Sequence, residues 1–213
     1  MLISYSYLIS KYAFEPKGIL HVGAHELEER EDYLASGVEK IIWVEGNPSL
    51  VERAQGILKN SNREKVLNGL VHSESDLEVD FKITNNSQSS SILEFGKHKL
   101  HHPRVNFIQN LKMKTITLYD LLEKASIPRG EFDFINLDIQ GLELQALKGL
   151  GDYFFDLKYI YSEINTSEVY RNNDTLDQID SYLSQFGFSR VETCITEYEW
   201  GDAFYIKRDE NRD

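Results

Sequence analysis

The stretch GILHVGAHELEE (residues 18–29), followed by IIWVEGNP (residues 41–48), decides the fold of this chain. An apolar run ends in Gly23, an acidic segment with helical character follows, and a second apolar run ends in Glu45, 22 residues after Gly23. This order is the layout of a mononucleotide-binding βαβ unit, in which the glycine lets the backbone approach a ligand and the carboxylate binds ribose hydroxyls. The stretch therefore predicts either a cofactor site at the edge of a parallel sheet or a purely structural strand, helix and strand.

The length and composition of the chain limit the number of domains and the kinds of partner to be expected. Its 213 residues, 41% of them hydrophobic, suit one domain with a substantial core. The formal net charge of -12 would repel a phosphate-rich polymer, so nucleic acid is not expected as a partner. No apolar run approaches the roughly 20 residues of a membrane span, and the N-terminus lacks the basic start of a signal peptide, so we expect no membrane partner and a cytoplasmic location. Cys194, the single cysteine, excludes an intramolecular disulfide and is expected to be a small buried hydrophobe.

Apolar periodicity predicts strands that alternate with helices, which is typical of an α/β fold with a mostly parallel sheet. Within residues 1–17, a leading helix over residues 2–14 is expected to pack on the domain at 18–207, and residues 208–213 are expected to form a disordered tail. The predicted strands are 19–22, 40–44, 66–71, 132–137 and 159–165, and the predicted helices are 26–35, 117–124, 175–186 and two that begin at about 47 and 142. Two further strands, 188–195 and 202–206, form an antiparallel hairpin at the C-terminal edge. Residues 77–116, with alternating segments at 77–83 and 111–116, form a small β insertion.

Glycine or polar residues follow four of the predicted strands, at 23–25, 45–47, 138–141 and 163–165. In a parallel sheet, ligands bind outside the carboxyl ends of the strands, so these segments are expected to meet at one site. The dinucleotide pattern G-x-G-x-x-G is absent, because His25 and Leu27 follow Gly23 where glycines would be needed. This disfavours a pyrophosphate cofactor, and with it an NAD-dependent reductase, but leaves a cofactor without phosphate, such as S-adenosylmethionine.

Five motifs occur in order along the chain: HVGAHE (21–26), WVEGNP (43–48), NNSQSSS (85–91), NLDIQGLE (136–143) and WGDA (200–203). Together they resemble FkbM-type methyltransferases, and the resemblance covers residues 18–206. It implies a Rossmann-like class I fold with a seven-stranded sheet, S-adenosylmethionine as cofactor, and methylation of a hydroxyl on a sugar, a glycan or a glycosylated small molecule. Family members commonly have glycine at the position of Leu27, so this side chain is expected to point away from the methionine end of the cofactor.

The resemblance also implies which residues contact the cofactor. They are Gly23, Ala24 and His25 at its methionine portion, Glu45 at its ribose, and Asn47 and His72 near its adenosine. Each of these roles has a structural alternative: Gly23 suits any tight turn, Glu45 favours the positive end of the following helix, and His72 suits an exposed loop.

Methyl transfer to an alcohol needs an aligned hydroxyl and a group that removes its proton. Asp138 is the first candidate for this base, since burial would raise the pKa of its carboxylate, and Glu163 is the second. Alternatively, Asp138, Glu163 and Asn165 could hold Mg²⁺. The metal is possible but not favoured, because three oxygen-bearing side chains at strand ends also arise without one.

Polar side chains from the insertion and from the later strand ends are candidates for contacts with the sugar or glycan acceptor. They are Asn85, Gln88, Ser90, Ser91, Glu143, Asn165, Trp200 and Asp202. Structural alternatives are a solvated turn at residues 85–91, a cap of the loop by Glu143, and an aromatic cover of the edge hairpin by Trp200.

Three histidines, His98, His101 and His102, are assigned to an exposed loop rather than to a metal site. A different class of function, a cofactor-free interaction module, is also consistent with the chain, and Leu27 is the residue that favours it. The leading helix and the edge hairpin are surfaces that a homodimer could use.

Overall fold

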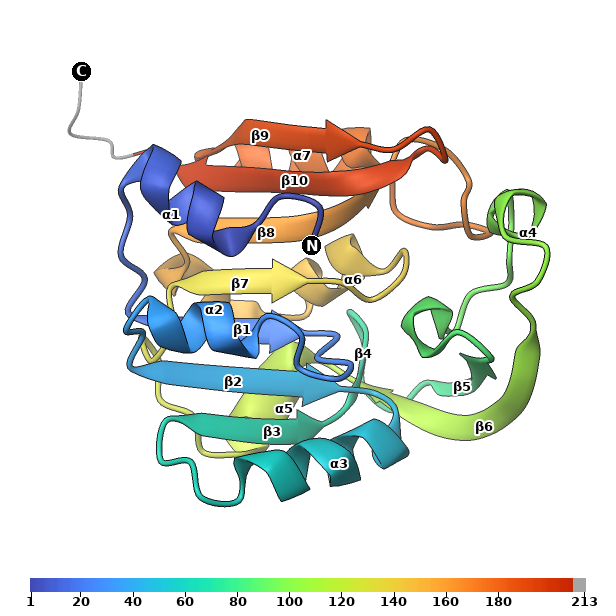
Figure 1. Ribbon diagram of the computed structural model, residues 1–213, viewed down its shortest axis with the longest axis horizontal. Coiled ribbons are helices and arrows are strands. Elements are labelled where there is room, and N and C mark those ends of the chain that lie inside the picture. The colour runs from blue at the N-terminus through green and yellow to red at the C-terminus, as the bar shows by residue number, and fades with distance from the viewer. Residues whose placement is uncertain (209–213) are drawn as a thin grey trace.

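The computed structural model describes residues 1–208, apart from the side chain of Ser87, and its centre is a seven-stranded sheet in the order β3-β2-β1-β7-β8-β10-β9 (Figure 1). The first five of these strands are mutually parallel, and β10 is antiparallel to both β8 and β9. This arrangement confirms the predicted sheet with its antiparallel C-terminal edge. The bounds are β1 Gly18–Val22, β2 Lys40–Glu45, β3 Glu64–Asn68, β7 Phe134–Leu137, β8 Tyr159–Asn165, β9 Phe188–Ile195 and β10 Trp200–Lys207.

Helices cover both faces of the sheet, which explains why its central strands are almost continuously apolar (Figure 1). One core contains side chains of α1, α2 and α3, and the other contains side chains of α5, α6 and α7. Leading helix α1 packs on the domain through Tyr5 and Leu8, and the Tyr5 ring meets Phe134 of β7 edge-on at 5.6 Å. The bounds are α1 Tyr5–Tyr12, α2 Arg30–Ala35, α3 Pro48–Leu58, α5 Leu118–Lys124, α6 Glu143–Lys148, the 3₁₀ helix η2 Gly151–Asp156 and α7 Leu176–Ser184.

Capping residues start two helices where the sequence predicts them. Asn47 follows β2 directly and accepts a hydrogen bond from the Ser49 N–H at 3.1 Å, with Pro48 in the first turn of α3. Thr117 accepts one from the Asp120 N–H at 3.0 Å and starts α5. The turn after Glu45 is therefore held by local hydrogen bonds at the edge where the strands end.

The insertion forms a second sheet, in the order β4-β6-β5, beyond the carboxyl ends of the parallel strands (Figure 1). One prediction here is wrong: the single strand expected at 66–71 is divided at Gly69 into β3 of the main sheet and β4 of the small one. A Cβ at Gly69 would lie 2.7 Å from Leu121 Cδ2, so a larger residue at this crossing point would require the Leu121 side chain to move. The elements are β4 Leu70–Val71, β5 Glu78–Thr84, η1 Ser87–Ser89, α4 His98–His101 and β6 Phe107–Ile116.

The loop after β1 explains a second difference from the prediction. The helix expected at 26–35 begins only at Arg30, because His25 (φ 43°) and Leu27 (φ 65°) are in left-handed conformations that an α-helix cannot contain. Leu27 therefore has the backbone conformation of a glycine. Its side chain is buried in the core with α1 and α2, which agrees with the expectation that it points away from the cofactor.

Two further expectations concern the edge strand and the C-terminus. Cys194 is exposed on the edge strand β9, so its predicted burial is wrong; this strand has a neighbour on one side only. Of the predicted tail, Arg208 donates its backbone N–H to the Gly187 carbonyl at 2.9 Å, and residues 209–213 lie outside the described residues. Within residues 1–208, no helix has the length and apolar character needed to cross a membrane.

The backbone at Leu27 predicts an unusual order of stability for two substitutions. Leu27→Ala and Leu27→Gly both lose the buried side chain, at a cost of about 2–5 kcal/mol. Glycine then avoids the left-handed penalty of about 1–2 kcal/mol that alanine retains, so Leu27→Gly should be the more stable variant by about 1 kcal/mol. Urea unfolding of the two variants measures this difference. Greater stability of the alanine variant would contradict the left-handed conformation.

Candidate functional site

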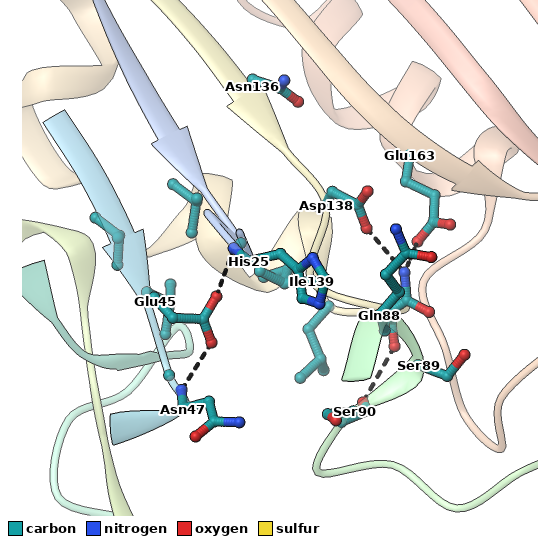
Figure 2. A pocket seen from close by; sticks show the side chains of 18 of the residues that line it. His25, Glu45, Asn47, Gln88, Ser89, Ser90, Asn136, Asp138, Ile139 and Glu163 are labelled. Carbon is teal, nitrogen blue, oxygen red and sulfur yellow. Dashed lines mark hydrogen bonds between the residues drawn. The ribbon is translucent and has the colours of Figure 1, made fainter. Parts of the chain in front are cut away.

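A cavity of about 380 Å³ lies where the carboxyl ends of the parallel strands meet the insertion (Figure 2). Met1 and Leu2 also line it. Four strand ends contribute to it, as the sequence predicts from the rule that ligands bind at this edge. Twelve of the predicted site residues line it: Gly23, His25, Glu45, Asn47, Gln88, Ser90, Ser91, Asp138, Glu163, Asn165, Trp200 and Asp202.

Four predicted site residues are not among the described residues that line the cavity. Ala24 is buried in the core, and the side chain of His72 lies beside Ser73. The Asn85 amide donates to the Arg104 carbonyl at 3.0 Å and accepts from the Asn106 N–H at 2.9 Å, away from the cavity. Glu143 is fully buried beneath the loop that follows β7.

Glu143 holds that loop in place. Its Oε1 accepts hydrogen bonds from the backbone N–H groups of Ile139 at 3.0 Å and Gly141 at 3.1 Å. Burial raises the pKa of Glu143 to about 8, because the charged form is poorly solvated there. The structure therefore gives Glu143 the loop-capping position that the sequence left as its alternative.

The glycine loop and Glu45 are joined by direct hydrogen bonds (Figure 2). The two carboxylate oxygens of Glu45 accept from the backbone N–H groups of His25 at 2.9 Å and Asn47 at 2.7 Å. A carboxylate has about four acceptor positions, so each oxygen retains capacity for a ligand hydroxyl. Burial raises the pKa of Glu45, and the two backbone N–H groups oppose this rise by stabilising the charged form.

Gln140 joins the two candidate catalytic carboxylates, and the sequence analysis gave it no role. Its Nε2 donates to Asp138 Oδ1 and to Glu163 Oε2, both at 2.8 Å, and its Oε1 accepts from the Tyr170 hydroxyl at 2.5 Å. Gln140 has a φ of 58° and stands in the quoted motif NLDIQGLE, so its position was visible in the sequence. Its partner Tyr170 comes from a distant loop that no motif marks.

The pKa values of both carboxyl groups are raised. Solvent reaches Asp138 through the cavity, yet the surrounding protein desolvates its carboxylate enough to raise its pKa to about 6. Glu163 is buried, and desolvation followed by the negative charge of Asp138 raises its pKa well above the usual value. Desolvation and the charge of Asp138 thus favour the protonated form of Glu163, while Asp138 with its pKa of about 6 is mostly ionised at neutral pH.

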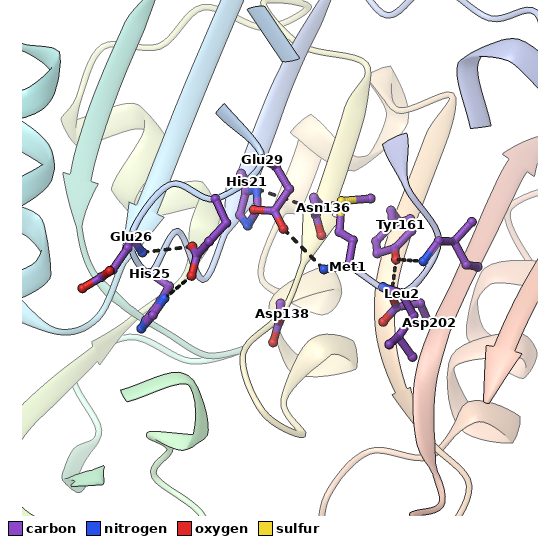
Figure 3. Close-up of polar contacts among 12 residues, drawn as sticks. Met1, Leu2, His21, His25, Glu26, Glu29, Asn136, Asp138, Tyr161 and Asp202 are labelled. Carbon is purple, nitrogen blue, oxygen red and sulfur yellow. Dashed lines mark hydrogen bonds and ion pairs between the residues drawn. The ribbon is translucent and has the colours of Figure 1, made fainter. Parts of the chain in front are cut away.

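The first residues of the chain form one wall of the cavity, which the sequence analysis did not predict (Figure 3). Asp202 accepts short hydrogen bonds from the Leu2 backbone N–H and from the Tyr161 hydroxyl. The α-ammonium group of Met1 lies 3.4 Å from Glu29 Oε1. These contacts hold the N-terminal segment against β8 and the first residues of β10.

The insertion closes the opposite wall. Ser91 Oγ donates to the Gln140 carbonyl at 3.2 Å, which connects the polar loop to the loop after β7. His98 and His102 line the cavity, and the His98 ring stacks on Phe95 with a centroid distance of 4.7 Å. The assignment of His98 to an exposed loop is therefore wrong, and its burial lowers its pKa to about 4. Among the described residues, no group of three or more His, Cys, Asp or Glu side chains is arranged to hold a metal ion.

Comparisons with known proteins agree with this architecture. Residues 21–190 match the sequence profile of the methyltransferase FkbM domain. A comparison with curated protein sequences gives no significant match. An uncharacterized protein from Listeria monocytogenes serotype 4b superposes with a TM-score of 0.53 at 9% identity, over 92% of this chain and 64% of its own. A ribosomal protein L11 methylase from Lactobacillus delbrueckii subsp. bulgaricus superposes with a TM-score of 0.50 at 12% identity, over 94% of this chain and 75% of its own.

The two superpositions, at such low identity, show the fold alone, and this chain spans less than two thirds of the length of the Listeria protein. The profile match is more specific, since it extends from β1 into β9 and includes all four strand ends at the cavity. The chain belongs to the methyltransferase FkbM domain family and has the Rossmann-like fold of class I S-adenosylmethionine-dependent methyltransferases.

Proposed function

We propose that the cavity binds S-adenosylmethionine and that the chain transfers the methyl group to a hydroxyl of a sugar, a glycan or a glycosylated small molecule. The charge of the cavity lining is the observation that carries this proposal. Six carboxylate side chains line the cavity, and none of its described lining residues is lysine or arginine. The six are Glu28, Glu29, Glu45, Asp138, Glu163 and Asp202.

The negative charge of the cavity lining favours a cationic cofactor over an anionic one. A sulfonium cofactor carries positive charge at its reacting centre, which a carboxylate-rich cavity attracts. A pyrophosphate cofactor such as NAD would bring negative charges against the same carboxylates, and no lysine or arginine among the described lining residues would compensate them. The same repulsion disfavours nucleotide sugars, so we infer an acceptor without phosphate groups.

Several residues that line the cavity suit individual parts of the cofactor. Glu45 presents its remaining acceptor positions to ribose hydroxyls, and Leu50, Leu70 and Val71 provide an apolar wall nearby for an adenine ring. This wall replaces the expected contact by His72, whose side chain lies outside the cavity. The interaction-module alternative rested on Leu27, and this side chain is buried in the core instead of filling the cavity.

The acceptor end has polar groups that remain available to a ligand. Asn165 is 1% exposed, lines the cavity, and its Nδ2 has no hydrogen-bond partner among the described residues. A buried donor without a partner costs about 1–3 kcal/mol, which a sugar hydroxyl would recover by accepting from it. Gln88 and Trp200 line the same cavity and provide an amide and an apolar ring for a sugar.

The residues at the end of β7 and β8 fit the chemistry of O-methylation. When bound, S-adenosylmethionine supplies a methyl group attached to a sulfonium, and neutral S-adenosylhomocysteine is the leaving group. The chain must then align the acceptor oxygen and take its proton as the new oxygen–carbon bond forms. We assign proton removal to Asp138. Because its pKa is about 6, its carboxylate is mostly ionised at neutral pH and can accept a proton. We assign to Glu163, whose raised pKa favours its protonated form, a hydrogen bond donated to a sugar oxygen, and Gln140 holds both carboxyl groups in place.

The cofactor assignment predicts a selective binding result. By isothermal titration calorimetry the chain should bind S-adenosylhomocysteine and should not bind NAD. Glu45→Ala should lose about 1.5–3 kcal/mol of S-adenosylhomocysteine affinity, since hydrogen bonds to a charged group are removed. An unchanged dissociation constant in a folded variant would contradict the ribose role, and binding of NAD alone would contradict the cofactor.

The assignment of the base predicts a pH-dependent rate. Asp138→Asn keeps the size of the side chain but cannot take a proton, so turnover should fall by about 100-fold or more while S-adenosylhomocysteine still binds. The rate of the unaltered chain should rise with pH through about 6, because Asp138 loses its proton there, and the variant should lack this rise. Transfer of labelled methyl to a panel of neutral glycosides measures both effects. Full activity of the variant would contradict the assignment of Asp138 as the base. Proton removal would then be assigned to Glu163 or to no residue of the chain.

A further inference from the structure

Two segments that are far apart in the sequence are paired beside the cavity, and this pairing holds Tyr170 in place. Residues 94–98 of the insertion pair with residues 168–171, and the Gly96 N–H donates to the Val169 carbonyl at 3.0 Å. A Cβ at Gly96 would lie 2.4 Å from a backbone carbonyl oxygen of the second segment, so the close approach needs a glycine at this position. The insertion therefore fixes the backbone that carries Tyr170.

The Tyr170 side chain is buried, and its hydroxyl reaches Gln140. Tyr170 is 2% exposed, and the centroid of its ring lies 5.2 Å from that of His98 and 6.1 Å from that of Phe95. The hydroxyl donates to Gln140 Oε1 at 2.5 Å. Burial raises the pKa of this hydroxyl well above its usual value, so it keeps its proton and remains a donor.

The Tyr170 hydroxyl determines which end of the Gln140 amide faces the two carboxyl groups. A side-chain amide has a nitrogen that only donates and an oxygen that only accepts. With its oxygen held by the hydroxyl, the amide directs its nitrogen to Asp138 Oδ1 and Glu163 Oε2, both at 2.8 Å. Desolvation raises the pKa of both carboxyl groups, and the donation by Gln140 opposes this rise. In the reversed orientation the amide oxygen would instead face the carboxylate of Asp138, and two acceptors would repel each other.

We propose that Tyr170 is a positioning residue for the proposed base, because its hydroxyl fixes the Gln140 amide in the orientation that donates to Asp138. This inference rests on the proposed function, which assigns proton removal to Asp138. Without the hydroxyl the amide is free to turn, and Asp138 loses a donor that stabilises its charged form. Since the insertion holds Tyr170, the insertion shapes the proposed base in addition to forming one wall of the cavity.

Other ionisable groups also act on Asp138, so the test compares variants in which all of them are unchanged. These groups are the carboxyl groups of Glu29, Glu143, Glu163 and Asp202 and the amino group of Met1. Tyr170→Phe keeps the ring and removes only the hydroxyl. Tyr205→Phe is the matched control, because Tyr205 is 1% exposed and its hydroxyl donates to Asp180 at 2.8 Å. Neither Tyr205 nor Asp180 is among the described residues that line the cavity.

Nuclear magnetic resonance of the chain labelled with ¹³C at its aspartate carboxyl groups follows the titration of Asp138 without any ligand. The signal of Asp138 is identified by its absence from Asp138→Asn. In the unaltered chain and in Tyr205→Phe, this group should titrate at a pH of about 6. In Tyr170→Phe the midpoint should rise by about one pH unit, because a hydrogen bond to the charged form is weakened.

A second pair of variants tests whether Tyr170 acts through Gln140. Asparagine tolerates the left-handed backbone at this position (φ 58°), and its shorter side chain withdraws the amide from its partners. Gln140→Asn alone should therefore raise the midpoint of Asp138, and adding Tyr170→Phe to it should cause no further shift.

An unchanged midpoint in Tyr170→Phe, or an equal shift in Tyr205→Phe, would overturn the positioning role. A full further shift in the double variant would also overturn it, because Tyr170 would then act without Gln140. The titration needs no cofactor, so failure of the unaltered chain to bind S-adenosylhomocysteine in calorimetry would overturn the proposed function separately. The ring and its contacts stay in Tyr170→Phe, so this variant should fold, and its urea midpoint checks this.

Discussion

The close contact of two strand ends at Gly23 is the constraint on which the site depends. A Cβ at Gly23 would lie 1.8 Å from the Asp138 carbonyl oxygen, and its φ of 95° is one that side chains rarely adopt. The Asp138 N–H donates to the Val22 carbonyl at 2.9 Å, so β1 and β7 stay paired up to this point. Only glycine allows the loop of the proposed cofactor residues and the loop of the proposed base to begin at the same place.

From that junction, the site is built by backbone groups that position carboxylates. Glu45 is held by two N–H groups of neighbouring loops, and Glu143 holds two N–H groups of the loop that carries Asp138. Desolvation raises the pKa values of Asp138 and Glu163, and the neighbouring acidic side chains raise them further. A sulfonium cation would stabilise the charged forms of these carboxylates, so the same group of acidic side chains favours the proposed cationic cofactor.

The sheet and most of its site were predictable because both follow from local patterns. Apolar runs of strand length and the residues just after them are read directly from the sequence, and parallel pairing brings those ends together. The break at Gly69 and the left-handed turn at Leu27 were not predictable, because each depends on what another segment places beside it. Likewise, Tyr170 and Met1 reach the cavity only through contacts across the fold, and nothing in their local sequence marks them.

A crystal structure of the chain with S-adenosylhomocysteine would show where each part of the cofactor lies. We expect the ribose hydroxyls on the carboxylate of Glu45 and the sulfur facing Asp138 across the junction at Gly23. A ligand bound outside the cavity, or bound inside it with the adenosine against Asp138 and Glu163, would refute the proposed cofactor site.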